Sequence, residues 1–127
     1  MDMKNTLTRT EWAVMSVLWE KPHQTVSGII GTMKEDMGWK YNTYVTYLKR
    51  MCEKKLVGFQ QLGRDKFYFP LVEQNECIQT ESQSVIEKMN GRGTKEFLVC
   101  MIKRSSLSEK DREELKTLLD NLNKEGD

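Results

Sequence analysis

Three side chains between residues 40 and 55 have the types and the spacing needed to contact the edges of nucleic-acid bases. Thr43, Thr46 and Arg50 recur at i, i+3 and i+7, so a helix places them on one face. A threonine offers its hydroxyl to a base edge or its methyl to a thymine methyl, and an arginine chelates guanine or holds a phosphate. The same pattern also fits an ordinary solvated helix face, so the neighbouring segments must decide between the two interpretations.

Other polar residues extend this candidate surface. Asn42 either reads adenine in bidentate fashion or caps the N-terminus of the helix, and the sequence leaves both roles open. Lys40 and Lys49 add positive charge beside it. Thr25 and Ser27 begin the preceding predicted helix and can present their hydroxyls to a phosphate, although capping alone explains both.

The hydrophobic pattern changes its period near Leu56 and predicts a β-hairpin directly after the helix. A run of mixed apolar and polar residues leads to a Gly-containing turn at 63–65, and an aromatic strand at 67–70 follows. Arg64 at the tip and Lys66 beside it suit a phosphate or minor-groove contact, which positions a protein without reading sequence. The alternative is a charged turn that favours solubility. A polar-faced helix followed by a basic-tipped hairpin is the outline of a winged helix.

Two shorter helices are predicted ahead of this segment. Thr8 and Glu11 have the spacing of a capping box that opens a helix over residues 9–20, which ends before Pro22. Thr25 is expected to cap a second helix, and Gly38 suits the left-handed residue after its last turn. The apolar face of this second helix consists of Val26, Ile29, Ile30, Met33 and Met37. A short turn is then expected before the third helix, over roughly 41–55, which is the helix-turn-helix layout that places a helix in the major groove.

Aromatic residues are frequent in the same region. A row of exposed rings would form a stacking platform for single-stranded nucleic acid. Here Tyr44 lies at the spacing of the helix core, and Phe67 and Phe69 alternate with Tyr68 along a strand, so we interpret the set mostly as core. They are Tyr44, Tyr47, Phe67, Tyr68 and Phe69.

Charge is distributed unevenly along the chain. The formal net charge is +1, but residues 40–66 hold seven Lys and Arg against two Asp and Glu, whereas residues 73–127 hold nine against twelve. A local excess of positive charge beside a hairpin is typical of a nucleic-acid-binding face.

The C-terminal third predicts three helices with more apolar surface than about 50 residues can bury on their own. A sparse apolar stripe runs over 73–89, Thr94 is expected to cap a short helix that is apolar nearly all round, and Ser108 starts a last helix. Burial against a second copy of the chain removes the excess. The predicted dimer interface consists of Ile78, Val85, Ile86, Phe97, Leu98, Met101, Ile102, Leu115, Leu118, Leu119 and Leu122.

The composition argues against catalysis and metal binding. His23 is the only histidine and has no cysteine near it in sequence, so a metal site or a catalytic triad has no second member. We find neither a Gly-rich phosphate loop nor a pair of carboxylates suited to acid–base chemistry. We therefore expect that the protein is not an enzyme and holds no metal or cofactor.

The cysteines and the hydropathy indicate a cytoplasmic location. Cys52, Cys77 and Cys100 are odd in number and lack CxxC spacing, which is typical of reduced thiols. Cys100 lies in the apolar tail segment and is expected to be buried and inert. No apolar run approaches the roughly 18 residues that cross a bilayer, and residues 1–12 lack the apolar region of a signal peptide, so we expect no membrane insertion.

With these residues in view, the chain resembles the penicillinase/methicillin-resistance repressor family (BlaI/MecI/CopY type). The similarity runs from Leu7 to about Asn123 and is carried by LTRTEWAVMSVLWE, TYVTYLKRMCEKKLV, GRDKFYFP and the three-helix tail. The resemblance implies a homodimeric repressor on a palindromic double-stranded DNA operator, often with TACA/TGTA half-sites, controlling β-lactam-resistance or related genes. In some members it also implies a membrane sensor and proteolysis in the dimerisation region.

Three departures from the family pattern bear on regulation and local structure. Cys100-Met101 stands where penicillinase repressors are cut between Asn and Phe, so the resemblance does not carry cleavage over to this chain. The tail DNLNKEGD lacks the cysteine cluster of the copper-responsive branch. Lys55 replaces a glycine that is common after the recognition helix.

The combined prediction is a mainly α protein with a small β-hairpin wing. A winged helix-turn-helix DNA-binding domain over 1–72 is followed by a three-helix dimerisation domain over 73–127. Its predicted function is sequence-specific transcriptional repression on double-stranded DNA. The competing interpretation is a winged-helix module that binds a protein partner and never DNA, and the basic neighbours of the third helix favour the former.

Overall fold

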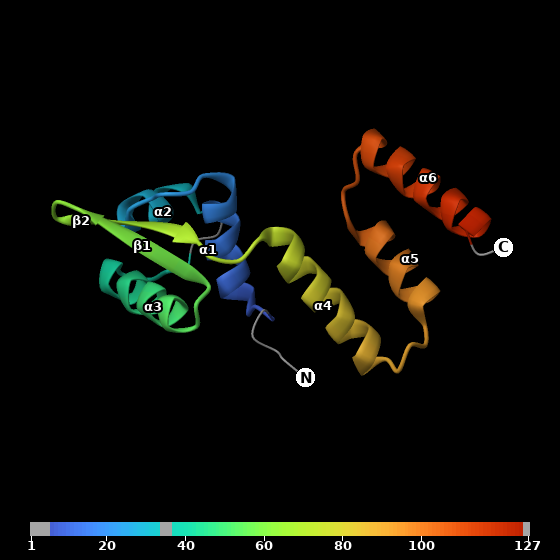
Figure 1. Cartoon of the computed structure of the whole chain (residues 1–127), viewed down its shortest axis with the longest axis horizontal. Coiled ribbons are helices and arrows are strands. Elements are labelled where there is room, and N and C mark those ends of the chain that lie inside the picture. The colour runs from blue at the N-terminus through green and yellow to red at the C-terminus, as the bar shows by residue number, and fades with distance from the viewer. Residues whose placement is uncertain (1–5, 34–36, 126–127) are drawn as a thin grey trace. The chain divides into compact units, whose positions relative to one another are not determined.

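The structure is a computed structural model that describes residues 6–33 and 37–125, without the side chains of 123–125. It divides into two compact units, Met1–Val85 and Ile86–Asp127. Figure 1 shows the order of the elements along the chain. The boundary between the two units falls inside a helix, Gln74–Lys88, and the domain boundary predicted at residues 72/73 stays a prediction.

In its described residues, the first unit contains three complete helices, the first part of a fourth and a two-stranded antiparallel sheet (Figure 1). In chain order these elements are α1 (Arg9–Glu20), α2 (Val26–Thr32), α3 (Tyr41–Glu53), β1 (Val57–Leu62) and β2 (Asp65–Pro70). The first part of α4 (Gln74–Lys88) belongs to the same unit. The predicted combination of a helical unit with a hairpin wing is confirmed.

The N-terminus of α1 is closed by the predicted capping box. Thr8 Oγ1 accepts a hydrogen bond from the amide of Glu11 at 3.1 Å, and Glu11 Oε1 accepts from the amide of Thr8 at 2.9 Å. These two bonds satisfy two amides that the helix itself leaves without partners. The helix ends at Glu20, two residues before Pro22, as the sequence predicts.

Helix α2 begins as predicted and ends early. Thr25 Oγ1 accepts from the amide of Gly28 at 3.1 Å, which is the expected N-cap. The helix ends at Thr32 with Met33 in an extended conformation, so the predicted extension of its apolar face to Met33 and Met37 is wrong. Two glycines in a seven-residue helix lower its intrinsic stability by about 1 kcal/mol each relative to alanine.

The connection from α2 to α3 is longer than the short turn expected. It runs from Met33 to Lys40, and its residues 34–36 lie outside the described part. Gly38 has the predicted left-handed conformation, with φ +67°, but it does not directly follow the helix. Trp39 packs on the core, as predicted.

Helix α3 ends in a Schellman motif. The amide of Leu56 donates to the carbonyl of Met51 at 3.0 Å, and the amide of Lys55 donates to that of Cys52 at 3.0 Å. This motif needs a left-handed residue in the position of Lys55, which has φ +63°. Glycine adopts this conformation without strain, whereas a lysine Cβ crowds the following carbonyl. The chain therefore carries a lysine in a position suited to glycine.

The wing is a hairpin with a two-residue loop. Leu62 pairs with Asp65 and Val57 with Pro70, so the loop consists of residues 63 and 64, and the predicted turn at 63–65 is one residue too long. Gly63 has φ +64°. A glycine with positive φ at the first loop position is typical of a type II′ turn, whose twist matches that of the strands.

The hairpin is anchored to the helices by its second strand. Tyr68 exchanges two backbone hydrogen bonds with Gln24, at 2.8 and 3.1 Å, in an isolated bridge. Phe69 lies over Gly58, where a Cβ would come within 3.1 Å of the ring. A side chain at Gly58 would require the Phe69 ring to shift by a few tenths of an ångström.

The core of the first unit combines all its elements. Tyr44, Leu48 and Met51 are buried, which confirms the predicted apolar face of α3. Tyr68 is also buried, whereas Phe67 and Phe69, predicted mostly as core, are half-buried. The other buried apolar residues are Leu7, Val14, Met15, Leu18, Val26, Ile29, Leu56, Val57 and Cys77.

The first half of α4 is tied to α1. Glu81 Oε1 accepts from the amide of Leu7 at 3.0 Å and from Trp12 Nε1 at 3.3 Å. Cys77 of the same helix is fully buried in the core of the first unit. Trp19 Nε1 also donates to the carbonyl of Val72 at 2.9 Å, just before α4. The Glu81 carboxylate thus has a structural role, because it holds α4 against the start of α1.

The second unit contains the end of α4 together with α5 (Thr94–Arg104) and α6 (Glu109–Glu125). Ser108 Oγ accepts from the amide of Asp111 at 3.0 Å, which confirms the predicted start of α6. Thr94 was expected to cap α5 but is its first residue, because the left-handed Gly93 occupies the capping position. None of the described helices is long and apolar enough to cross a membrane.

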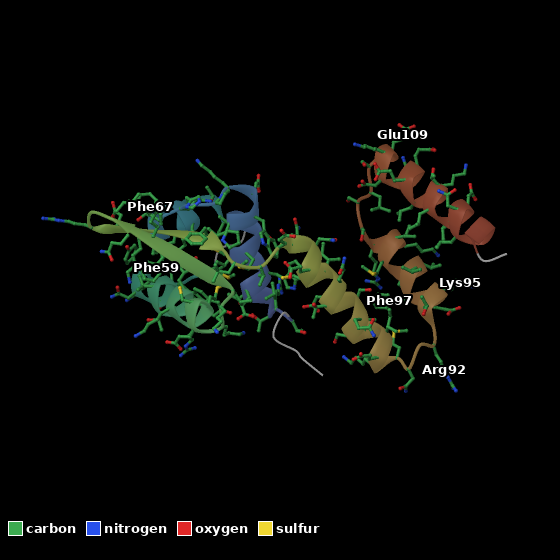
Figure 2. All side chains as sticks on the ribbon, viewed as in Figure 1. Phe59, Phe67, Arg92, Lys95, Phe97 and Glu109 are labelled. Atoms are coloured by element: carbon green, nitrogen blue, oxygen red, sulfur yellow. The ribbon has the colours of Figure 1, made fainter. Side chains whose placement is uncertain are left out.

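Helix α5 has no buried residue in the single chain. Its apolar side chains, including Phe97, are exposed (Figure 2). Cys100 is likewise exposed in the single chain, and its predicted burial against a second copy stays a prediction. These side chains are exposed because α5 is apolar on several sides while its own unit supplies too little surface to cover it.

Candidate nucleic-acid interface

The polar face of α3 is open to solvent along its whole length. Lys40, Asn42, Thr43, Thr46, Lys49 and Arg50 are all exposed. Lys40 occupies the N-cap position and makes no capping bond through its side chain. Asn42 is the second residue inside the helix, so the capping role considered for it is wrong. Its amide group remains on the exposed face.

Four of these residues surround a single hollow. The hollow has a volume of about 300 Å³ and is lined by Asn42, Thr43, Thr46, Tyr47 and Arg50. The structure thus brings together the threonines and the arginine whose spacing indicated a shared face. Lys49 is exposed but does not line the hollow. Tyr47 does line it, although the sequence predicted this residue to be mostly core.

The hydroxyl of Thr46 is turned toward the helix backbone. Thr46 Oγ1 donates to the carbonyl of Asn42 at 3.0 Å, a bond that threonines often make with the preceding turn. The hydroxyl proton is therefore already used. The lone pairs of that oxygen and the methyl group are what Thr46 can offer a base edge.

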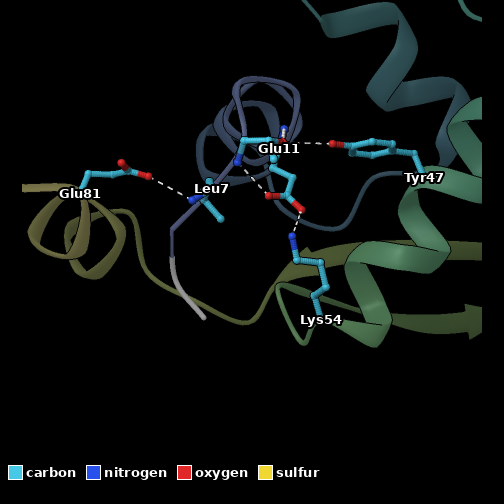
Figure 3. Close-up of polar contacts among 6 residues, drawn as sticks. Leu7, Glu11, Tyr47, Lys54 and Glu81 are labelled. Atoms are coloured by element: carbon cyan, nitrogen blue, oxygen red, sulfur yellow. Dashed lines mark hydrogen bonds and ion pairs between the residues drawn. The ribbon is translucent and has the colours of Figure 1, made fainter. Parts of the chain in front are cut away.

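Tyr47 is held at the side of the hollow by two contacts. Its hydroxyl lies 3.2 Å from Thr8 Oγ1 at the start of α1 (Figure 3). Its ring lies 5.0 Å from that of Trp39, measured between centroids. The side chain is half-buried as a result. No local sequence pattern pairs residues 8 and 47, but the i+4 spacing from Thr43 to Tyr47 does put both on neighbouring parts of one face.

A second contact joins α1 to α3. Lys54 Nζ donates to Glu11 Oε2, while Glu11 Oε1 takes part in the capping box (Figure 3). Glu11 is buried, with 3% of its surface exposed. A buried carboxylate is tolerated only when its oxygens are satisfied. The network therefore fixes the end of α3 against the first turn of α1.

The two cationic side chains of the wing, Arg64 and Lys66, have different surroundings. Arg64 lies in the two-residue loop and is exposed. Lys66 Nζ lies 4.4 Å from the centroid of the Phe59 ring, which is a cation–π contact on the strand face. Arg64 is thus the wing cation with greater reach toward a phosphate.

At the start of α2 the structure supports the simpler interpretation for one residue. Thr25 caps the helix through Gly28, as described above. Ser27 is exposed. A phosphate contact by either residue stays a prediction.

The thiols and acidic groups do not form a metal site in the described part of the chain: no three His, Cys, Asp or Glu side chains come close enough to share an ion. Burial raises the pKa of the Cys52 thiol, with Lys66 lowering it and Glu53 raising it by smaller amounts. Cys52 therefore stays protonated, in the form that is a poor nucleophile and metal ligand.

A helical unit in which a β-hairpin directly follows a polar-faced third helix is a winged helix-turn-helix. The model of the penicillinase repressor family matches residues 7–121. The chain belongs to this family, as the sequence indicated, and is a transcriptional repressor of the winged-helix type.

Individual relatives are distant but span the chain. The methicillin resistance regulatory protein MecI of Staphylococcus aureus (strain N315) is 25% identical over 120 residues, which cover 94% of this chain and 98% of that protein. The penicillinase repressor of Staphylococcus aureus is 20% identical, covering 93% and 94%. Among solved structures, Staphylococcus aureus MarR in complex with salicylate and kanamycin has a TM-score of 0.51 at 12% identity, covering 92% of this chain and 71% of that one. The MarR likeness shows a shared fold.

Proposed function

We propose that the protein represses transcription as a homodimer bound to a palindromic operator in double-stranded DNA. Each subunit inserts α3 into a major groove and lays its wing on the flanking backbone. The observation that carries the proposal is the open hollow on α3, lined by an amide, two threonines, a tyrosine and a guanidinium. These side chains are of the types that contact base edges. Lys40 and Lys49 add positive charge at the same helix, and Arg64 adds it in the wing.

The exposed apolar residues of the C-terminal helices support the proposed dimer. Leu115, Leu118, Leu119 and Leu122 lie at the spacing of one helix face in α6, and all four are exposed. The other predicted interface residues are exposed as well, except Val85, which is half-buried. A second copy of the chain would cover these faces, and the C-terminal helices would set the spacing between the two α3 helices.

The names of the relatives support a proposal about the genes that this protein controls. MecI is named as a methicillin resistance regulator, and other relatives are penicillinase repressors. We propose that this chain controls β-lactam-resistance or related genes in the cytoplasm, and that it is not an enzyme. A membrane sensor and protease pathway is part of this proposal, although Cys100-Met101 within α5 differs from the family's Asn-Phe bond.

The proposal is tested by titrating the purified protein onto the intergenic DNA upstream of its own gene, at two salt concentrations. A random duplex serves as competitor. Tight binding that resists the competitor and weakens as salt rises is the expected result. Equal binding to both duplexes would reduce the protein to a non-specific DNA binder. Absence of binding to either would favour the protein-interaction module.

A further inference from the structure

We infer that Tyr47 determines part of the base specificity, and that the hollow beside it receives the C5-methyl group of a thymine. The inference rests on the proposed function, because it requires α3 to enter a major groove. It adds to that function a residue outside the predicted contact set and a particular chemical group on the DNA.

The first step is that the Tyr47 ring forms a fixed wall. Its hydroxyl is held by Thr8 at 3.2 Å, and Thr8 is itself held by the capping box with Glu11. The Trp39 ring packs against it at 5.0 Å. A side chain that is already immobile loses little conformational entropy when a ligand arrives, so its contact contributes more to affinity.

The second step is the chemistry of the hollow. The tyrosine ring and the threonine methyls are apolar, and the Thr46 hydroxyl is turned back to the carbonyl of Asn42. The Asn42 amide and the Arg50 guanidinium supply hydrogen-bond donors at the same hollow. In the major groove, thymine presents a methyl group next to the O4 acceptor. An apolar wall with adjacent donors matches that pair.

The third step compares thymine with the other pyrimidine. Cytosine presents its N4 amino group in place of O4 and has no methyl, and proteins usually read it with a carboxylate acceptor. None of the five residues that line the hollow is an aspartate or glutamate. The Arg50 guanidinium is a donor only and suits thymine O4, whereas the Asn42 amide and the Thr46 hydroxyl oxygen can also accept a hydrogen bond. The hollow therefore favours thymine over cytosine chiefly through its apolar wall, which only the thymine methyl can contact.

The test removes one methyl group at a time from the DNA. A duplex is first selected by the full-length protein from a randomised library, and each thymine in its footprint is then replaced by deoxyuridine. One thymine in each half-site should be sensitive. Binding should weaken about four-fold for each methyl lost, the equivalent of about 0.8 kcal/mol, and about fifteen-fold when both half-sites are changed. Replacement of thymines outside the footprint is the control on the DNA side.

Protein variants then assign the effect to Tyr47. In Tyr47→Ala the thymine and deoxyuridine duplexes should bind equally, whatever the absolute affinity. Tyr41 is an exposed tyrosine of the same helix and does not line the hollow. Tyr41→Ala should therefore keep the four-fold ratio between the affinities for the thymine and deoxyuridine duplexes. Tyr47→Phe keeps the ring while losing the bond to Thr8, and it should retain most of the ratio. Circular dichroism confirms that each variant is folded.

The outcomes separate the inference from the function on which it rests. Enrichment of a duplex whose thymines can all be replaced without effect would overturn the inference and leave the repressor standing. A four-fold ratio that persists in Tyr47→Ala would move the methyl contact to another residue. A library that yields no enriched duplex would overturn the proposed function and the inference together.

Discussion

Lys54, just after α3, donates a hydrogen bond to the buried carboxylate of Glu11, 43 residues earlier in the chain. The other oxygen of that carboxylate accepts from the amide of Thr8. The same glutamate therefore closes the N-terminus of α1 and holds the end of the helix that carries the hollow. Because the Tyr47 hydroxyl contacts Thr8, the first turn of α1 supports α3 at two separate places.

We expect Lys54→Met to lower the free energy of unfolding by about 1–2 kcal/mol, because it leaves the Glu11 carboxylate without its cation. Breaking a fully buried pair costs about 3–5 kcal/mol, and the loss is smaller here since 47% of the Lys54 side chain is exposed. Urea denaturation followed by circular dichroism measures the change. Lys49→Met on the exposed face of α3 is the matched control and should stay within about 0.5 kcal/mol of the wild type. Equal stabilities of the two variants would contradict a structural role for the ion pair.

Lys55→Gly should raise stability by about 1 kcal/mol. The residue has φ +63°, where a lysine is strained by roughly 1–2 kcal/mol and a glycine is not, and the greater entropy of glycine in the unfolded chain removes part of the gain. The same denaturation experiment measures the shift. Lys49→Gly makes an identical exchange inside α3 and should instead lower stability by about 1 kcal/mol. Destabilisation by both glycines would show that the left-handed conformation is not a source of strain.

Arg50→Ala should weaken operator binding about 10- to 100-fold, because a guanidinium that contacts a base edge contributes roughly 1–3 kcal/mol. Thr46→Ala should also weaken it, while sedimentation shows the dimer unchanged. Arg92→Ala is the control, because it removes an exposed arginine between α4 and α5. The affinity of this variant for the operator should match that of the wild type. If neither Arg50→Ala nor Thr46→Ala alters the affinity, the face of α3 has been wrongly assigned.

Leu119→Glu should convert the proposed dimer into monomers. Leu119 is 61% exposed in the single chain, and a charge placed in an apolar interface loses its hydration without gaining a partner. Sedimentation equilibrium should show the dissociation constant rise by about 100-fold or more, a cost of several kcal/mol. Lys116→Glu, on the same helix, should leave the mass unchanged. A dimer that survives the leucine substitution would place the interface elsewhere.

Stability should fall at alkaline pH. Burial raises the pKa of the Cys77 thiol above its ordinary value of 9.0, with smaller contributions from Glu76 and Glu81. The folded chain therefore holds this proton more tightly than the unfolded chain does, so stability is fully present below pH 9 and declines as the pH rises through the folded pKa. Urea midpoints should be level from about pH 7 to 8.5 and drop above pH 9. Cys77→Ala should reduce that slope, and an unchanged slope would assign the loss to other groups.

The local features of the fold were readable from the sequence. The capping box of Thr8 and Glu11, the buried stripe of α3 and the hairpin each depend on residues a few positions apart, and all three are present. The early end of α2 was not readable. Its apolar residues continue with helical spacing through Met33 to Met37, and periodicity alone does not mark where weak helix formers end the helix.

The candidate site was only partly readable for a different reason. Thr43, Thr46 and Arg50 share a face through helical spacing, so their meeting in one hollow needs no tertiary information. Tyr47 takes its position from Thr8 and Trp39, and Glu11 takes its partner from residue 54, so both depend on contacts between separate elements. An aromatic residue at helical spacing is also most often core. Cys100 is exposed in the single chain, and its predicted burial depends on a second copy of the chain.

The two-residue loop of the wing restricts how this hairpin can change in length. Side chains alternate between the two faces of a strand, so one extra residue in each strand would turn Arg64 and the rest of the tip to the opposite face. Two extra residues in each strand would restore the original face and extend the tip by about 6.6–6.8 Å. Hairpins of this design are therefore expected to grow by four residues at a time, and an insertion of two would reverse the side from which the wing meets its target.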